Sequence, residues 1–226
     1  MALEIVLKLE NNTYLKDPQG SEIGKKIIKS SILLISELGY EHFTFKKLAT
    51  EINSTEATIY RYFENKHKIL VYIMELYWSY IHFQVLMAIR EINDSRKKIE
   101  KIIDLLVWED NQDVSFGGYD QACLYKICIT EGSKAFLSKE VEAMNQQKLF
   151  EPYKELVEMI AGVFSEYKPN FKYPRSLASS LVELSHLQYY FMHHLPRLTD
   201  LKEKTPKSLE AYLEHLVFGS LELNRK

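Results

Sequence analysis

Apolar side chains recur along the first part of the chain at the spacing of a helix face. Between Glu22 and Gly39 they lie three to four and seven to eight positions apart, so one side of a helix there would be apolar. Glycine is favoured just beyond a helix C-terminus, and Gly39 follows the last of these residues. The sequence therefore predicts a first helix ending at Gly39, with an apolar stripe of Ile23, Ile27, Leu34, Ile35 and Leu38.

Two short apolar stripes and a long one come next. The first begins at Phe45 and is interrupted by Asn53-Ser54, both of which favour turns. The second begins at Thr55 and reaches only about Tyr62. Asn65 is a suitable N-cap for the third, which runs past residue 81. The pattern predicts two short helices and then a long one.

The remainder of the chain also shows helical periodicity, with prolines at or between the expected helix ends. No segment alternates between apolar and polar residues as a half-buried strand does. Residues 1–20 have weak periodicity and end in the turn-forming Asp17-Pro18-Gln19-Gly20. The sequence therefore predicts an all-α fold behind an N-terminal extension. The further helices are expected over roughly 95–109, 119–130, 138–167, 174–194 and 206–223, with a loop over 109–118.

Composition and charge narrow the class of protein only a little. Hydrophobic residues make up 46% of the chain and charged residues 27%, which is ordinary for a soluble globular protein. The two cysteines have no metal-binding spacing, and we find neither a long uninterrupted apolar stretch nor a secretory signal, so we predict a cytoplasmic protein without a structural metal. The formal net charge is −2, and residues 21–80 hold eight Lys and Arg against seven Asp and Glu, so charge gives no sign of a nucleic-acid partner.

The segment from Phe43 to Leu70 has the pattern of two short helices joined by a tight turn. Asn53 stands where such a turn needs a positive φ, which Asn tolerates better than most residues. Thr55 can cap the second helix and leave its first turn, residues 56–58, exposed. A recognition helix enters the major groove of DNA in this way, with its N-terminal residues against base edges. The segment therefore predicts a helix-turn-helix.

The side chains around this turn suit a contact with DNA. Methyl groups of threonine and alanine can contact thymine, and Glu56 can accept a hydrogen bond from cytosine N4. Arg61 can contact guanine or phosphate, and the other hydroxyl and ammonium groups can bind phosphates. Lys66 lies in the first turn of the long helix, where the helix dipole also favours a phosphate. The predicted DNA-binding residues are Thr44, Lys46, Lys47, Thr55, Glu56, Ala57, Thr58, Tyr60, Arg61, Tyr62 and Lys66.

This segment resembles the DNA-binding domain of the TetR/AcrR family of regulators over roughly residues 21–72. The resemblance implies that Ile59 and Phe63 are core positions and that Tyr60 and Lys66 hold the DNA backbone. Glu56 departs from the family pattern, which commonly has a basic or neutral residue there. The matching positions are Thr44, Leu48, Ala49, Thr55, Thr58, Ile59, Tyr60, Phe63 and Lys66.

Beyond about residue 80 the resemblance implies only an architecture of helices, a ligand pocket and a two-fold dimer. The chain would then comprise an N-terminal extension (1–20), a helix-turn-helix domain (21–66) and a helical regulatory and dimerisation domain (67–226). The predicted helices 174–194 and 206–223 are apolar on more than one face, so each can pack both on its own subunit and on a partner. We predict a homodimer formed through these two helices.

Aromatic and sulfur-containing side chains are frequent in this second part, and for any single one of them a place in the ordinary core is favoured over a place in a pocket. Sites for small molecules are largely apolar, and the resemblance to the family implies a ligand pocket among these side chains taken together. His186 and His193 lie two turns apart but lack an acidic or cysteine partner at ligand spacing, which favours core or interface histidines over a metal site. The predicted pocket residues are Phe83, Trp108, Tyr119, Cys123, Tyr125, Tyr153, His186 and Tyr189.

These features predict a ligand-responsive transcriptional regulator that binds DNA, and the resemblance implies a repressor. Its expected partners are a pseudo-palindromic operator in double-stranded DNA, bound as a homodimer, and a small-molecule effector that releases it. We find no Gly-rich phosphate loop and no nucleophile elbow, so we predict no enzyme, no catalytic residue and no cofactor. The alternative is a helical partner-binding protein with a degenerate helix-turn-helix, which the low basic charge and Glu56 favour.

Overall fold

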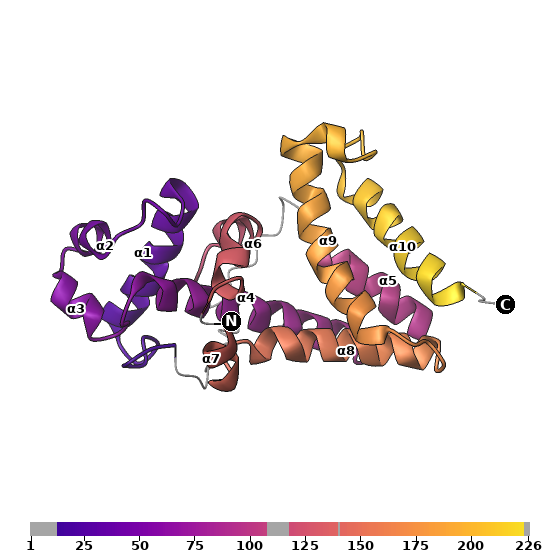
Figure 1. The fold of residues 1–226 in the computed structure, drawn as a ribbon, viewed down its shortest axis with the longest axis horizontal. Coiled ribbons are helices and arrows are strands. Elements are labelled where there is room, and N and C mark those ends of the chain that lie inside the picture. Colours follow the sequence, from indigo (N-terminus) through magenta and orange to yellow (C-terminus); the bar gives the residue numbers. More distant parts are fainter. Residues whose placement is uncertain (1–12, 108–117, 140, 224–226) are drawn as a thin grey trace. The chain divides into compact units, whose positions relative to one another are not determined.

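Helices make up the regular structure of the chain (Figure 1). The computed structural model describes residues 13–107, 118–139 and 141–223, and within these ranges no strand is formed, which confirms the predicted all-α class. The chain divides into two units: residues 1–80 with 113–151, and residues 81–112 with 152–226. The proposed functional boundary at residue 66 stays a prediction.

The first unit holds the predicted helix-turn-helix. α1 (Glu22–Leu38) begins where the Ser21 hydroxyl accepts a hydrogen bond from the Gly24 amide (3.2 Å) and ends at Gly39, whose φ is +79°. α2 (Phe45–Glu51), α3 (Glu56–Tyr60) and the start of α4 (Lys66–Ile89) follow at the predicted places. Asn53 has a φ of +53°, which confirms the prediction for the turn between α2 and α3. The core beneath them is made of residues such as Ile27, Ile32, Leu48, Ile59 and Phe63.

Two later helices complete this unit. α6 (Gln121–Phe136) packs against α1, and α7 (Val141–Gln146) follows it. The predicted end of α6 at residue 130 is wrong, because Thr130 and Gly132, both weak helix formers, lie inside the helix. Gly132 packs closely there, since a Cβ at this position would lie 3.3 Å from Cε of Met74 on α4.

The second unit contains the end of α4 together with α5 (Ser95–Leu106), α8 (Glu151–Tyr167), α9 (Pro174–His194), a short 3₁₀ helix (Pro196–Leu198) and α10 (Pro206–Glu222). The bounds of α9 and α10 agree with the prediction, because Pro174 and Pro206 each occupy a first helical turn. α10 packs on α9 and α5.

The predicted single helix over 138–167 is wrong, because α7 and α8 are separate helices. The chain leaves the helical conformation at Lys148, whose φ is +61°. Pro152 lies in the first turn of α8, where a proline without an amide hydrogen is tolerated. That proline is the sequence signal for the second start.

The described part of the N-terminal extension lies on the first unit. The Leu15 amide donates to the Tyr62 carbonyl (2.7 Å), and the Gln19 side-chain amide donates to the hydroxyls of Tyr72 (3.0 Å) and Tyr119 (2.7 Å). Gly24 allows the close approach, because a Cβ there would lie 2.3 Å from the Pro18 carbonyl oxygen. Residues 13–20 therefore belong to the packing of this unit.

α4 contributes much of the apolar core. By length and composition it could cross a membrane, but 72% of its qualifying window is buried within the protein. Tyr72, Ile73 and Leu76 are among its buried side chains. Such burial is typical of the core helix of a soluble protein.

Candidate DNA-binding surface

Capping hydroxyls define the start of both short helices. The Thr44 hydroxyl accepts a hydrogen bond from the Lys47 amide (3.2 Å), and the Thr55 hydroxyl accepts one from the Thr58 amide (3.3 Å). Between the helices, the Ser54 amide donates to the Ala49 carbonyl (2.8 Å). Local hydrogen bonds therefore set the path from α2 into α3 and leave the first turn of α3 at the surface.

Most of the predicted DNA-binding residues are exposed and come from the first turn of α2 and from α3 with its flanks. Thr58 and Lys66 are half-buried, and Tyr62 is buried. An exposed first turn of α3 is the geometry that a recognition helix needs. The exposed members are Thr44, Lys46, Lys47, Thr55, Glu56, Ala57, Tyr60 and Arg61.

Tyr60 links α3 to α2 while keeping its hydroxyl outside. Its ring meets that of Phe45 edge-on, with centroids 4.8 Å apart, and the side chain is 51% exposed. The neighbouring Thr58 hydroxyl bonds to that of Thr55 (3.1 Å) and accepts from Arg61 Nη2 (3.3 Å). The outward side of α3 therefore presents a phenol, a linked pair of hydroxyls and a guanidinium.

Tyr62 takes part in the scaffold of the unit. It is 3% exposed, and its hydroxyl bonds to that of Ser21 (2.8 Å). The Lys16 ammonium lies over its ring, 5.1 Å from the centroid. This hydrogen bond from Ser21, with Lys16 nearby, lowers the pKa of Tyr62. Because Tyr62 is almost fully buried, a phosphate contact would require its hydroxyl to become accessible, and that contact stays a prediction.

Lys66 binds backbone carbonyl groups of its own unit, a structural role that the sequence did not predict. Its ammonium donates to the carbonyls of Tyr40 (3.0 Å), Glu41 (3.2 Å) and Phe43 (3.3 Å) and lies 4.5 Å from the centroid of the Tyr40 ring. The first residue of α4 therefore fixes the turn between α1 and α2. Its predicted phosphate contact stays a prediction, and substituting it would disturb this turn as well.

The predicted ligand-binding residues are divided between the two units. Tyr119, Cys123 and Tyr125 lie at or on α6 in the first unit, and Phe83, Tyr153, His186 and Tyr189 lie in the second. Trp108 lies outside the described residues. Cys123 and Cys128 are free thiols, and burial raises the pKa of Cys123, opposite to what a redox switch needs. The shared pocket therefore stays a prediction.

The structure contains two grooves that the sequence did not predict. One, of about 580 Å³, is lined in the first unit by Lys25, Lys26 and Lys29 of α1 and by Tyr119. The other, of about 570 Å³, lies between the ends of α8, α9 and α10 in the second unit.

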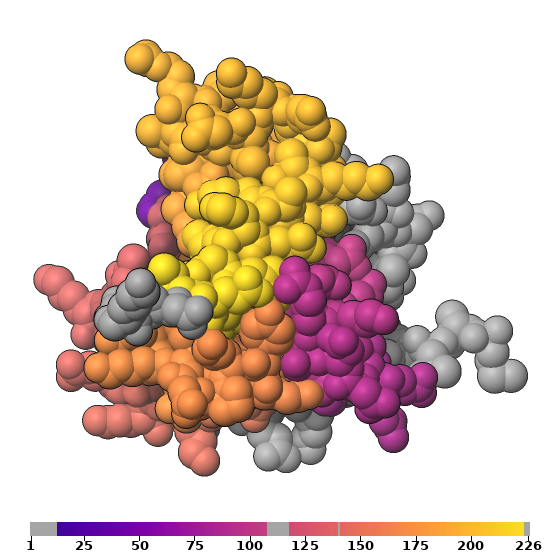
Figure 2. Space-filling model, turned by 90° about the vertical axis from the view of Figure 1, so that its right-hand side faces the viewer, coloured from indigo at the N-terminus to yellow at the C-terminus, as the bar shows by residue number. Residues whose placement is uncertain are grey.

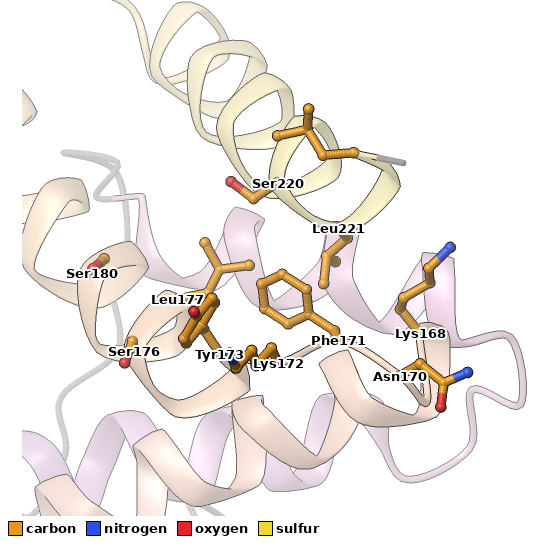
Figure 3. A pocket seen from close by; sticks show the side chains of 11 residues that line it. Lys168, Asn170, Phe171, Lys172, Tyr173, Ser176, Leu177, Ser180, Ser220 and Leu221 are labelled. Carbon is orange, nitrogen blue, oxygen red and sulfur yellow. The ribbon is translucent and has the colours of Figure 1, made fainter. Parts of the chain in front are cut away.

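Figure 3 shows the second groove, with Phe171 and Leu177 between Lys168 and Asn170 on one side and Ser176 and Ser180 on the other. The sequence feature that could have indicated this groove is the pair Lys168 and Lys172, in the short segment between two predicted helices. Part of the lining comes from α9 and α10, the helices predicted to form the dimer.

Comparisons with known proteins agree with this geometry. The family described as bacterial regulatory proteins of the tetR family matches residues 27–73, which cover most of α1, all of α2 and α3 and the start of α4. Comparison with curated proteins gives no match.

Solved structures of regulators share the fold at low sequence identity. The regulator FadR from Bacillus subtilis in complex with stearoyl-CoA is 20% identical over 86% of this chain and 98% of that one, with a TM-score of 0.62. A TetR-family regulator from Bordetella parapertussis is 15% identical over 91% and 100% of the two chains, with a TM-score of 0.57. AibR with isovaleryl coenzyme A and operator DNA is 18% identical over 85% and 96%, with a TM-score of 0.56. The helix-turn-helix segment, residues 27–73, is therefore similar to the tetR family of bacterial regulatory proteins.

Proposed function

We propose that this protein is a cytoplasmic transcriptional regulator that binds a pseudo-palindromic operator as a homodimer and is released by a small-molecule effector. The observation that carries the proposal is the exposed, Thr55-capped first turn of α3 within a tetR-family helix-turn-helix. Repression is the direction we expect, and the proposal assigns the chain no catalytic reaction.

The effector is the least defined part of the proposal. The B. subtilis FadR structure contains stearoyl-CoA and the AibR structure contains isovaleryl coenzyme A together with operator DNA. Because this chain shares their fold, coenzyme A thioesters are the first compounds to test. α4 begins beside the helix-turn-helix and ends in the second unit, so an effector that shifts α4 would change operator affinity.

Operator binding is tested by removing the Tyr60 hydroxyl. Tyr60→Phe keeps the ring against Phe45 and loses only one donor to a phosphate, so we expect about tenfold weaker binding, the value of one hydrogen bond to a charged acceptor. The measurement is a titration, by gel shift, of the DNA upstream of the protein's own gene.

Tyr173→Phe is the matched control, because Tyr173 is 48% exposed on the second unit and should not touch DNA. Equal binding by Tyr60→Phe and the wild type would contradict the phosphate contact. A wild-type protein that binds no DNA would instead favour a helical partner-binding protein.

The homodimer is tested on the outer face of α9. Leu187 of α9 is 45% exposed. The surface of α10, the second helix of the predicted interface, faces the viewer in Figure 2, beside α5. If these helices meet a partner, Leu187→Glu buries an unpaired charge, so we expect the dimer to dissociate at a protein concentration at least about tenfold higher than the wild type does. Sedimentation equilibrium measures this. Leu137→Glu, at a leucine 76% exposed in the first unit, should leave the dimer intact.

A further inference from the structure

We propose that α6 positions the helix-turn-helix for DNA by holding the turn between α1 and α2, and that Glu131 and Lys134 are the positioning residues. This turn (residues 39–43) is called the α1–α2 turn below. The inference rests on the proposed operator binding and adds a contact that neither the family match nor the sequence analysis assigns.

α6 is tied to the DNA-binding helices within one unit. It packs on α1 (Figure 1), and a Cβ at Gly132 would lie 3.3 Å from Cε of Met74 on α4. Nε2 of His67, in the first turn of α4, lies 3.2 Å from the Lys134 carbonyl oxygen. The C-terminal half of α6 therefore lies beside the start of α4 and the end of α1.

One face of the α1–α2 turn is bound by α6. The Tyr40 amide donates to Oε1 of Glu131 (3.1 Å), and Glu131 is nearly fully buried. Gly39 lies beside this carboxylate, since a Cβ at residue 39 would lie 3.4 Å from the same oxygen, and its φ of +79° favours glycine there. A side chain far away in sequence thus satisfies the backbone just beyond α1.

Lys134 completes the contact through charge. Its ammonium lies 2.8 Å from Oε2 of Glu131 and 3.0 Å from Oε1 of Glu41, and it is 5.7 Å from the centroid of the Tyr40 ring. The hydrogen bond from Lys134 lowers the pKa of Glu41, and the bonds to both acids raise the pKa of Lys134. One lysine of α6 therefore bridges its own helix to the turn.

The same turn is also bound by α4. Lys66 donates to the carbonyls of residues 40, 41 and 43, and both lysines lie near the Tyr40 ring. The backbone of the α1–α2 turn is thus held by side chains of two helices. Thr44, the N-cap of α2, follows this turn directly. Because α2 leads into α3 through a turn fixed by local hydrogen bonds, a shift of the α1–α2 turn relative to α6 moves the recognition helix.

The experiment removes the bridging charge and keeps its stem. For Lys134→Met we expect operator binding about twofold to thirtyfold weaker than wild type, the usual range for residues that couple through a network without touching the ligand. The probe is the wild-type binding fragment from upstream of the protein's gene, titrated at 25 °C. Lys126→Met removes the same charge from an exposed position on α6 and should leave binding unchanged. Lys134→Arg, which keeps both acids paired, should restore most of the affinity.

A second measurement reports on the turn itself. In Glu131→Ala the Tyr40 amide loses its acceptor, so its hydrogen exchange, followed by NMR, should become about tenfold faster. Glu142→Ala, at an exposed acid on α7, is the control.

If Lys134→Met lowers only the melting temperature and binds the operator as the wild type does, the positioning role is overturned. Unchanged exchange at Tyr40 in Glu131→Ala would overturn it too. A wild type that binds no DNA would overturn the proposed function itself, a result distinct from variants that match a binding-competent wild type.

Discussion

Replacing Phe63 with alanine is expected to lower the free energy of unfolding by about 3–5 kcal/mol, the usual cost of deleting a fully buried phenyl group. Phe63 is 0% exposed, and its ring meets that of Tyr72 edge-on with centroids 5.5 Å apart. It lies between α3 and α4, so the cavity would open beneath the recognition helix. Equilibrium denaturation in urea measures the loss.

Phe63→Leu separates the loss of packing from the loss of the ring. Leucine refills most of the volume, so its cost should be well below that of alanine. Leu137→Ala is the surface control and should change stability by less than about 0.5 kcal/mol, because the side chain is 76% exposed. If Phe63→Ala costs no more than Leu137→Ala, Phe63 is not a core residue of this unit.

Helix ends that are marked by local chemistry could be predicted from the sequence. Thr55 and Asn65 were expected to cap α3 and α4, and the Thr55 hydroxyl and the Asn65 amide oxygen accept the hydrogen bonds of N-caps. The cap of α2 by the Thr44 hydroxyl was not predicted, although threonine is a common N-cap residue. Pro174 and Pro206 gave the starts of α9 and α10. These signals act within a few residues, so a single sequence carries them.

Contacts between distant residues could not be predicted in the same way. The helix predicted over 138–167 is interrupted at Lys148, which has a left-handed backbone conformation. Lysine is not a residue type that indicates such a conformation, and helical apolar periodicity is present on both sides of it. The burial of Tyr62 depends on Ser21, and the orientation of Lys66 depends on the carbonyls of the α1–α2 turn. Residue type alone predicts a phosphate contact for each of them, and it does not show which polar groups of the protein also bind the side chain.

The same limit applies to α6. From the sequence it belonged to the predicted sensing domain, yet it is part of the unit that holds α1, α2 and α3. Glu131 and Lys134 are separated from the turn they bind by about ninety positions of sequence, and a charged pair on a helix normally predicts only a solvated face. Pairing in space, which no periodicity reveals, is what gives these two residues their proposed role.

Acidification is expected to destabilise the protein through His186 on α9. Burial lowers the pKa of His186 to about 4, whereas an unfolded histidine titrates near 6.5. Between these values the unfolded chain binds more protons, so the stabilisation is present above the unfolded pKa and is lost as the pH falls toward the folded one. From pH 8 to pH 5 the loss from this residue should be about 2 kcal/mol. Urea denaturation at both pH values measures it.

The comparison with His186→Gln isolates this contribution. Carboxylates and His82, whose pKa burial also lowers against the opposing charge of Glu155, contribute equally to wild type and variant, so their effects cancel in the difference. The variant should lose about 2 kcal/mol less than the wild type between pH 8 and pH 5. His194→Gln, at an exposed histidine of the same helix, should keep the wild-type dependence. Equal pH dependence in His186→Gln and the wild type would mean that His186 is protonated as readily in the folded protein as in the unfolded chain.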